Sequence, residues 1–154
     1  MSTTTSSEVR GVLLPLRTGQ LLLPNATVSE VVGYTPPESH SDDAPDWLLG
    51  SISWRQQMLP LVSFEVLAGS PREEVGHRAR IAICNTLNGN PKRPYIGLVL
   101  KAIPHLVKVT EESITPLDGE AKGEMILSRV EIAGQEAWIP DLDALEMALG
   151  DLLD

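Results

Sequence analysis

The sequence predicts an all-β fold, one barrel or a pair of barrels, with a single helix packed on the outside. Many short apolar segments alternate with turn-forming residues along the chain, a pattern typical of barrels. Helical spacing of apolar residues is convincing only in the last segment. Hydrophobic residues make up 42% and charged residues 21% of the 154 positions. This composition is that of a globular protein and not of a disordered chain.

Ten segments are strand candidates, because each is short, apolar and bounded by polar or turn-forming residues. In chain order they are residues 11–16, 20–23, 26–32, 47–54, 58–66, 80–86, 95–100, 103–109, 125–132 and 136–139. The spacing within 26–32 fits a strand or one helical turn equally well.

Turns are predicted where asparagine and glycine lie between these segments, since both residues tolerate the positive φ of tight hairpins. The clearest is Asn88-Gly89-Asn90, and Arg17-Thr18-Gly19 and Ala133-Gly134 are two more.

The helix is predicted to begin near Asp141, because aspartate at a helix start interacts favourably with the exposed N–H groups and the helix dipole. One apolar stripe follows at spacings of three and four residues, formed by Leu142, Leu145, Leu149 and Leu152.

Three polar stretches interrupt the apolar pattern. Residues 1–8 are expected to be disordered, because none of them is suited to burial. Residues 38–46, rich in aspartate and serine, are expected to form an exposed loop. Residues 69–77 are a candidate boundary between two lobes.

Charge and cysteine content narrow the classes of function. Acidic residues outnumber basic residues by 21 to 12, giving a net charge of −9. Such a surface repels nucleic-acid phosphates, and the longest basic cluster, Lys92-Arg93, is too short to reverse this. The single Cys84 excludes an internal disulfide and a multi-cysteine zinc site. No signal or membrane-spanning segment is recognisable, so a cytoplasmic location is expected.

No pattern typical of catalysis or of cofactor binding is found. His40, His77 and His105 are isolated from one another, and the acidic residues near His40 do not follow a calcium-loop pattern. Serine-nucleophile elbows and phosphate-binding loops are absent. Cys84 alternates with Ile81 and Ile83, as a small buried strand residue does. A binding module without a cofactor is therefore favoured over an enzyme.

Two stretches resemble the CheW family, the adaptors of bacterial chemosensory arrays. The first reads TVSEVVGY over residues 27–34, and is followed by WLLGSISWRQQMLPLV over residues 47–62. In the second stretch Gly50, Arg55 and Pro60 stand where the family has matching residues. Residues 80–83 and 95–100 are similar to a family strand pair with its G-L-V signature, and the closing D-L-D resembles residues 141–143.

This resemblance covers nearly the whole chain and implies a single domain over residues 9–149. Its fold would be two small, intertwined, five-stranded SH3-like barrels that share a hydrophobic core. Its function would be non-catalytic, bridging the regulatory domain of a CheA-type histidine kinase to the cytoplasmic tip of a chemoreceptor. The positions that match family contact residues are Val28, Glu30, Gly50, Arg55, Gly97, Ile103 and Leu106.

Each of these residues also has an ordinary structural interpretation. Val28, Ile103 and Leu106 are candidates for simple core residues, and Gly50 and Gly97 for tight backbone packing. Arg55 is the best functional candidate, because an arginine at a turn presents an exposed donor fork. Its alternative is an unpaired surface cation.

The chain departs from the family pattern at two places. Gln56 replaces the glycine that follows the family arginine. If the turn keeps a positive φ there, Gln56 costs about 1–2 kcal/mol of strain. If the turn has changed shape instead, φ lies near −60° and Arg55 is re-aimed. The second departure is the loop over residues 35–46, which is acidic here where the family is usually proline-rich and less charged, and it indicates an altered partner surface.

The sequence thus predicts a cytoplasmic chemosensory adaptor. Its divergence resembles that of CheW-like adaptors in pilus-controlling systems. The alternatives are a small-molecule or metal-binding β-barrel, and a degenerate adaptor that competes for the kinase.

Overall fold

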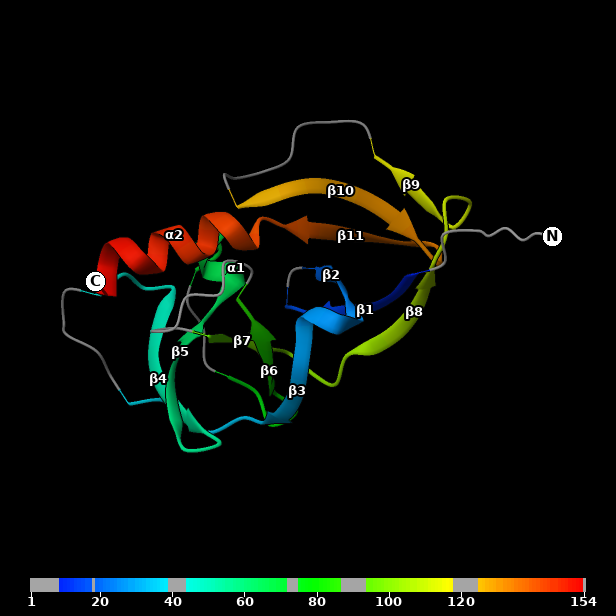
Figure 1. Cartoon of the computed structure of the whole chain (residues 1–154). Coiled ribbons are helices and arrows are strands. Elements are labelled where there is room, and N and C mark those ends of the chain that lie inside the picture. The colour runs from blue at the N-terminus through cyan, green and yellow to red at the C-terminus, as the bar shows by residue number, and fades with distance from the viewer. Residues whose placement is uncertain are drawn as a thin grey trace.

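The computed structural model describes residues 9–17, 19–38, 44–71, 75–86, 94–117 and 125–153. Within these ranges the chain forms two β-sheets (Figure 1). The strands are β1 (Val9–Pro15), β2 (Gln20–Pro24), β3 (Val28–Gly33), β4 (Leu48–Trp54), β5 (Gln57–Val62), β6 (Arg80–Asn85), β7 (Tyr95–Leu100), β8 (His105–Val109), β9 (Ile114–Pro116), β10 (Ile126–Ile132) and β11 (Gln135–Pro140). A short helix, α1 (Phe64–Leu67), follows β5, and the longer α2 (Leu142–Leu153) follows β11.

Each sheet defines one lobe. The first lobe is a six-stranded sheet in the order β8-β1-β2-β11-β10-β9, and the second is a five-stranded sheet in the order β3-β6-β7-β5-β4. The two-lobed β architecture is as predicted, and the first sheet carries one short strand more than expected, β9. The chain leaves the first lobe after β2 and returns at β8. Residues 69–77 therefore connect α1 to β6 within the second lobe, and the predicted lobe boundary there is wrong.

A shared core lies between the two sheets and receives side chains from both lobes. Its members are Val12, Leu14, Leu16, Leu21, Leu23, Leu48, Val62, Phe64, Ala82, Cys84, Ile96, Leu98, Leu100, Ile126, Leu142, Leu145 and Leu149. Each lobe also has its own interior. The first-lobe interior is Leu13, Leu22, Val130, Ile132 and Ala137. The second-lobe interior is Ile52, Trp54, Leu59, Leu61, Ile81, Ile83 and Val99.

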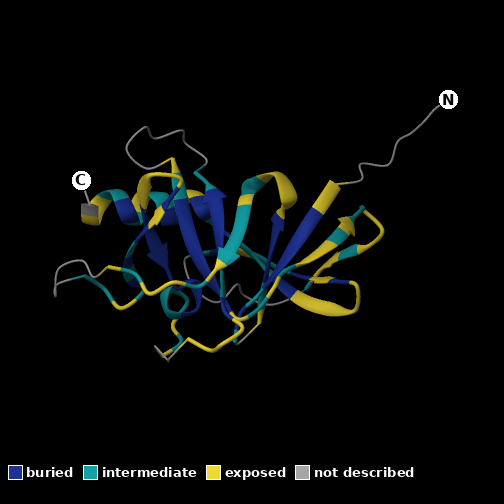
Figure 2. Ribbon diagram, turned by 90° about the horizontal axis from the view of Figure 1, so that it is seen from below, coloured by how far each residue is buried: buried dark blue, intermediate teal, exposed yellow. Residues whose placement is uncertain are grey.

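The central residues of β1, β2, β6 and β7 are consequently buried on both faces. Figure 2 shows several strands in the middle of the molecule that are dark blue over most of their length. Leu14 of β1 faces the shared core while its neighbour Leu13 faces the first-lobe interior. Similarly, Ala82 of β6 faces the shared core and Ile81 faces the second-lobe interior. Such strands need unbroken apolar runs in place of alternation. This explains the sequences of these four strands.

The C-terminal helix α2 packs on the shared core through Leu142, Leu145 and Leu149, as the apolar stripe predicts. Asp141 caps it, because its Oδ1 accepts a hydrogen bond of 3.0 Å from the backbone N–H of Ala144. Leu152, predicted to belong to the same stripe, is exposed. Among the described residues no helix is long and apolar enough to cross a membrane.

Three strands carry a shift of register, and each shift turns the strand from one core to another. In β3, Val28 packs on the shared core but Val32 packs on the second-lobe interior, although the two are four residues apart. Regular alternation would point both to the same face. The shift between Val28 and Glu30 supplies the extra residue that changes the face.

The other two shifts act in the same way. The shift between Leu48 and Gly50 separates Leu48, in the shared core, from the later β4 residues in the second-lobe interior. The shift between Ile126 and Ser128 separates Ile126, in the shared core, from Val130 in the first-lobe interior. These irregularities let outer strands contribute to two cores in succession.

Gly50 also allows the chain before β4 to cover the edge of that strand. Glu38 and Ser51 exchange two backbone hydrogen bonds of 2.8 Å. A Cβ at Gly50, whose φ is +147°, would overlap the carbonyl oxygen of Glu38. An uncovered edge would present unpaired N–H and C=O groups to other chains. Gly50 is therefore required by a close backbone approach.

The turn between β4 and β5 keeps the backbone of a tight two-residue hairpin. Trp54 pairs with Gln57, and the two residues between them have positive φ, 49° at Arg55 and 65° at Gln56. Two-residue hairpins with positive φ at both central positions match the twist of the strands and favour Asn-Gly. The turn has therefore not changed shape, and Gln56 carries the strain expected for a residue in place of glycine.

Several predicted elements need correction or refinement. Residues 64–66 are helical and do not continue the strand, because Ser63 Oγ accepts a hydrogen bond from Val66 N and caps α1. Residues 26–32 combine both options, with a 3-10 turn over Asn25–Thr27 before β3. The predicted strand over 103–109 begins only at His105.

Other predictions about turns and loops have mixed outcomes. Positive φ at Ala133 and Gly134 confirms the turn between β10 and β11. The predicted turn over residues 17–19 falls at the hairpin between β1 and β2, but its central residue, Thr18, lies outside the described residues. The predicted turn 88–90, the disordered segment 1–8 and most of the acidic stretch 38–46 lie outside the described residues.

Cys84 is a buried member of the shared core, as predicted for a small strand residue. Desolvation by burial raises the pKa of its thiol to about 12. The thiol is therefore protonated at neutral pH and acts only in packing.

Replacing Gly50 with alanine is predicted to destabilise the protein by at least about 1–3 kcal/mol, because strain at φ +147° adds to the overlap with Glu38. Urea denaturation followed by tryptophan fluorescence measures the loss. Gly69→Ala is the matched control, because Gly69 has φ +109° but open space around its Cα. Equal losses in the two variants would show that the approach of Glu38 contributes nothing.

Replacing Gln56 with glycine is predicted to stabilise the protein by about 0.5–1 kcal/mol, because relief of strain outweighs the added freedom of the unfolded chain. Gln57→Gly is the control, since Gln57 lies in β5 and glycine there should destabilise by about 0.5–1 kcal/mol. Urea denaturation midpoints of the variants and the wild type measure these changes. A midpoint for Gln56→Gly below that of the wild type would contradict a strained turn.

Candidate partner-binding surfaces

The seven residues predicted to bind partners lie in three different settings. Glu30 and Arg55 belong to an exposed cluster at the hairpin of the second lobe. Val28 and Leu106 border the shared core, and Ile103 is exposed in the segment before Leu106. Gly50 and Gly97 are buried inside the second lobe.

The hairpin cluster joins the two outer strands of the five-stranded sheet, β3 and β4. Glu30 of β3 accepts hydrogen bonds from Trp54 Nε1 at 3.3 Å and from Arg55 Nη2 at 3.1 Å. The Arg55 guanidinium lies over the Trp54 ring, 4.6 Å from its centroid. Trp54 in turn meets Tyr95 of β7 edge-to-face at 4.7 Å. We call Glu30, Trp54, Arg55 and Tyr95 the hairpin cluster.

The register shift in β3 makes this cluster possible. Because the shift lies between Val28 and Glu30, Val28 faces the shared core and Glu30 reaches the end of the second-lobe interior, where Trp54 lies. Regular alternation would place both side chains on one face.

Arg55 is exposed but not unpaired. Its side chain is 68% exposed, and that of its partner Glu30 is 40% exposed. An exposed ion pair contributes about 0.2–1 kcal/mol and an exposed cation–π contact about 0.5–1 kcal/mol. The interpretation of Arg55 as an unpaired surface cation is therefore wrong. The contacts hold its guanidinium in one place while most of the side chain remains accessible.

Two large apolar side chains are exposed on β8 and in the segment just before it. Ile103 is 58% exposed and Leu106 is 72% exposed, so neither is an ordinary core residue. Leu106 on the edge strand β8 pairs directly with Val12 of β1 and shares its face of the sheet. Val12 belongs to the shared core, so Leu106 extends that core into solvent.

Val28 borders the same core from the other lobe. It is half-buried and packs against the shared core from the start of β3. The shared-core margin, defined here as Val28 and Leu106, therefore combines residues of both lobes.

The two glycines have packing roles that the sequence left open. Gly50 is fixed by the approach of Glu38. At Gly97, a Cβ would meet Ile81 at 3.1 Å and both Leu59 and Leu61 at 3.3 Å. Both glycines are buried, so any influence on a partner would act through the backbone around them.

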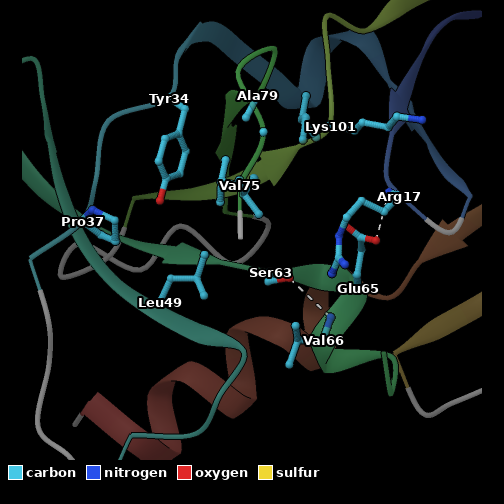
Figure 3. Close-up of a pocket in the computed structure, with 13 residues that line it drawn as sticks. Arg17, Tyr34, Pro37, Leu49, Ser63, Glu65, Val66, Val75, Ala79 and Lys101 are labelled. Atoms are coloured by element: carbon cyan, nitrogen blue, oxygen red, sulfur yellow. Dashed lines mark hydrogen bonds and ion pairs between the residues drawn. The ribbon is translucent and has the colours of Figure 1, made fainter. Parts of the chain in front are cut away.

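A cavity of about 750 Å³ lies beside α1 (Figure 3). In it the buried carboxylate of Glu65 accepts a 2.9 Å hydrogen bond from the backbone N–H of Arg17 and forms an ion pair with Arg17 Nε at 3.4 Å. Arg17 Nη2 also donates to the carbonyl of Pro71 at 3.2 Å. Arg17 belongs to the loop after β1 and Glu65 to α1, so the pair ties the lobes together. Replacing Arg17 would take the guanidinium away from the buried Glu65 carboxylate and would therefore be destabilising.

Metal binding finds no support in the part of the chain that the structure describes. Within those residues no three His, Cys, Asp or Glu side chains are grouped to hold an ion. His40, Asp42 and Asp43 of the acidic stretch lie outside it.

Sequence reasoning missed Trp54 and Tyr95, which support Arg55 and Glu30. A tryptophan directly before an arginine at a predicted hairpin was a usable indication, because stacking of the two is common. The contact of Glu30 depends on the register shift in β3, which no sequence pattern indicated.

Comparison with known proteins agrees with this geometry. The chain matches the family described as CheW-like domain over residues 10–148. No curated protein sequence matches it. The crystal structure of the scaffolding protein TtCheW from Thermoanaerobacter tengcongensis has the same fold, with a TM-score of 0.71 at 19% identity, covering 86% of this chain and 88% of that one. The chain belongs to the CheW-like domain family and is a non-catalytic chemosensory scaffold adaptor.

Proposed function

We propose that the unit 9–149 acts in the cytoplasm to couple a chemoreceptor to a CheA-type histidine kinase. The observation that carries the proposal is the exposure of Leu106 beside Val12 of the shared core, with Ile103 exposed three residues before it. An apolar side of a receptor helix would cover these side chains and extend the core, which is a common mode of helix recognition.

The hairpin cluster is the proposed contact for the kinase regulatory domain. It lies in the second lobe, at the end of β4, whereas Leu106 lies on β8 in the first lobe. An adaptor that bridges two proteins needs two surfaces that can be occupied together. Arg55 suits a specific contact, because its guanidinium is held by Glu30 and Trp54 while the side chain is mostly exposed.

We assign the output of the system to type IV pilus motility, on the divergence of the chain from the usual family pattern. Gln56 in the hairpin and the acidic residues 38–46 are the departures that support this assignment. A linked kinase, receptor or pilus gene beside the coding sequence would identify the system.

The kinase contact is tested with Arg55→Glu. Binding to the purified regulatory domain of the CheA-type kinase from the same cell should weaken at least tenfold, since truncating or reversing a positioned interface charge typically costs about 2 kcal/mol or more. The free energy of unfolding should fall by no more than about 2 kcal/mol, because the exposed Arg55 loses one ion pair and one cation–π contact.

Arg78→Glu is the control, because Arg78 is exposed outside the cluster. A Glu30→Arg/Arg55→Glu exchange should regain the ion pair without regaining binding, and Trp54 Nε1 then loses its acceptor at position 30. Unchanged binding by Arg55→Glu, or a loss of stability large enough to explain weaker binding, would contradict the proposed contact.

The receptor contact is tested with Leu106→Ser. Removing this 72% exposed side chain should weaken binding to a purified receptor cytoplasmic fragment while shifting stability by no more than about 0.5 kcal/mol. Leu127→Ser is the matched control, since Leu127 is 63% exposed on β10. Equal effects of the two substitutions would contradict the proposed site. Kinase binding without receptor binding by the wild-type chain would identify a competitor and not a bridging adaptor.

A further inference from the structure

The chain builds the same kind of two-residue hairpin in each lobe. In the first lobe Ala133 and Gly134 connect β10 to β11, with φ of 53° and 74°. In the second lobe Arg55 and Gln56 connect β4 to β5, with φ of 49° and 65°. Glycine is favoured at the second central position of such a turn, because it adopts positive φ without a steric cost. Gln56 therefore occupies the position that the other hairpin gives to glycine.

Contacts within the chain offset the strain at Arg55 but not the strain at Gln56. Arg55 forms an ion pair with Glu30 at 3.1 Å, and its guanidinium lies over the Trp54 ring. The Gln56 side chain is exposed and makes no hydrogen bond to any other residue that the structure describes. Residues held in strained backbone conformations cluster at functional sites. The packing of the chain gives no reason for glutamine at this position, so we looked for one in the contact with a partner.

We propose that the Gln56 side-chain amide contacts the kinase regulatory domain beside Arg55 and determines which regulatory domain is accepted. The inference rests on the proposed function, because the hairpin cluster is the kinase contact assigned there. An amide has both N–H donors and a carbonyl acceptor. Its complement on the kinase is an uncharged group that offers both, either an exposed peptide group or an amide side chain. A regulatory domain without such a group would leave the amide unpaired in the interface and bind less tightly.

The surroundings of Gln56 suit this contact. Arg55 is 68% exposed in its side chain, and Met58 of β5 is 56% exposed. The hairpin therefore presents a cation, a neutral amide and an apolar side chain within four consecutive residues. The tight turn fixes the backbone from which the amide projects, which lowers the entropy lost on binding. Arg55 supplies the charged part of the contact, and Gln56 supplies uncharged hydrogen bonds that depend little on salt.

The experiment measures binding of the full chain to the purified regulatory domain of the CheA-type kinase from the same cell, together with urea denaturation. Gln56→Gly should weaken binding about three- to tenfold, as the loss of a neutral hydrogen bond implies, and yet raise the denaturation midpoint. Gln56→Met keeps the length of the side chain and the strain of the turn but has no amide. It should weaken binding to the same extent and leave the midpoint unchanged.

Two further variants serve as controls. Gly134→Gln places glutamine in the corresponding hairpin of the first lobe, where Gly134 is exposed with open space around it. It should lower the denaturation midpoint without changing kinase binding. Arg55→Glu provides the comparison for charge, because its effect on binding should shrink as salt is raised, whereas the effects of Gln56→Gly and Gln56→Met should not.

The outcomes separate this inference from the proposed function. Wild-type affinity in both Gln56→Gly and Gln56→Met, with weaker binding by Arg55→Glu, would overturn the role of Gln56 and leave the kinase contact standing. Weaker binding by Gln56→Gly alone would show that the turn conformation matters and the amide does not, which would also overturn it. A wild-type chain that binds no regulatory domain would overturn the proposed function and this inference with it.

Discussion

The core shared by the two sheets is the constraint on which the rest of the molecule depends. The central residues of strands β1, β2, β6 and β7 have no solvent-facing side, because they lie between the shared core and the interior of their own lobe. A fully buried leucine or isoleucine contributes about 1.5–3 kcal/mol of hydrophobic stabilisation, so these strands hold the two lobes as one unit. Helix α2 and the buried pair of Arg17 and Glu65 add to the same connection. Neither lobe has an independent core large enough to make the other dispensable.

Strands β3, β4 and β10 have to serve this arrangement without being buried on both faces throughout. The register shifts in β3, β4 and β10 solve the problem, since each strand contributes first to the shared core and then to a lobe interior. The candidate surfaces follow from these shifts. Glu30 reaches Trp54 and Arg55 because β3 changes its face after Val28. Leu106 remains exposed because β8 is the outer strand on the open side of the shared core. The candidate partner surfaces thus lie where the packing of the shared core or of the second-lobe interior ends at solvent.

Much of the fold was predictable from local pattern, and most of the site was not. Unbroken apolar runs such as those of β1 and β7 identified the central strands, and Asp141 with the leucine stripe identified α2. The predicted strand over residues 58–66 was too long, because the continuous apolar run gave no sign that Ser63 caps the start of α1. β9 was missed because three residues are too short for alternation to be visible. At the site, the resemblance located Glu30, Arg55 and Leu106, but their contacts depend on register and strand order. Those quantities arise from pairings across the whole chain, which is why no local pattern contained them.

Cys84 gives the molecule a property of practical use. Its thiol is buried in the shared core and its pKa is raised to about 12, so almost no thiolate is present near neutral pH. Thiol reagents act on the thiolate and need access to it. It is also the only cysteine in the sequence. A cysteine introduced at an exposed position of either surface would therefore be the only one to react with a thiol-specific spectroscopic label. The native core would stay unchanged. The protein is therefore suited to measurements of the distance from a label in either lobe to a label on a bound partner protein.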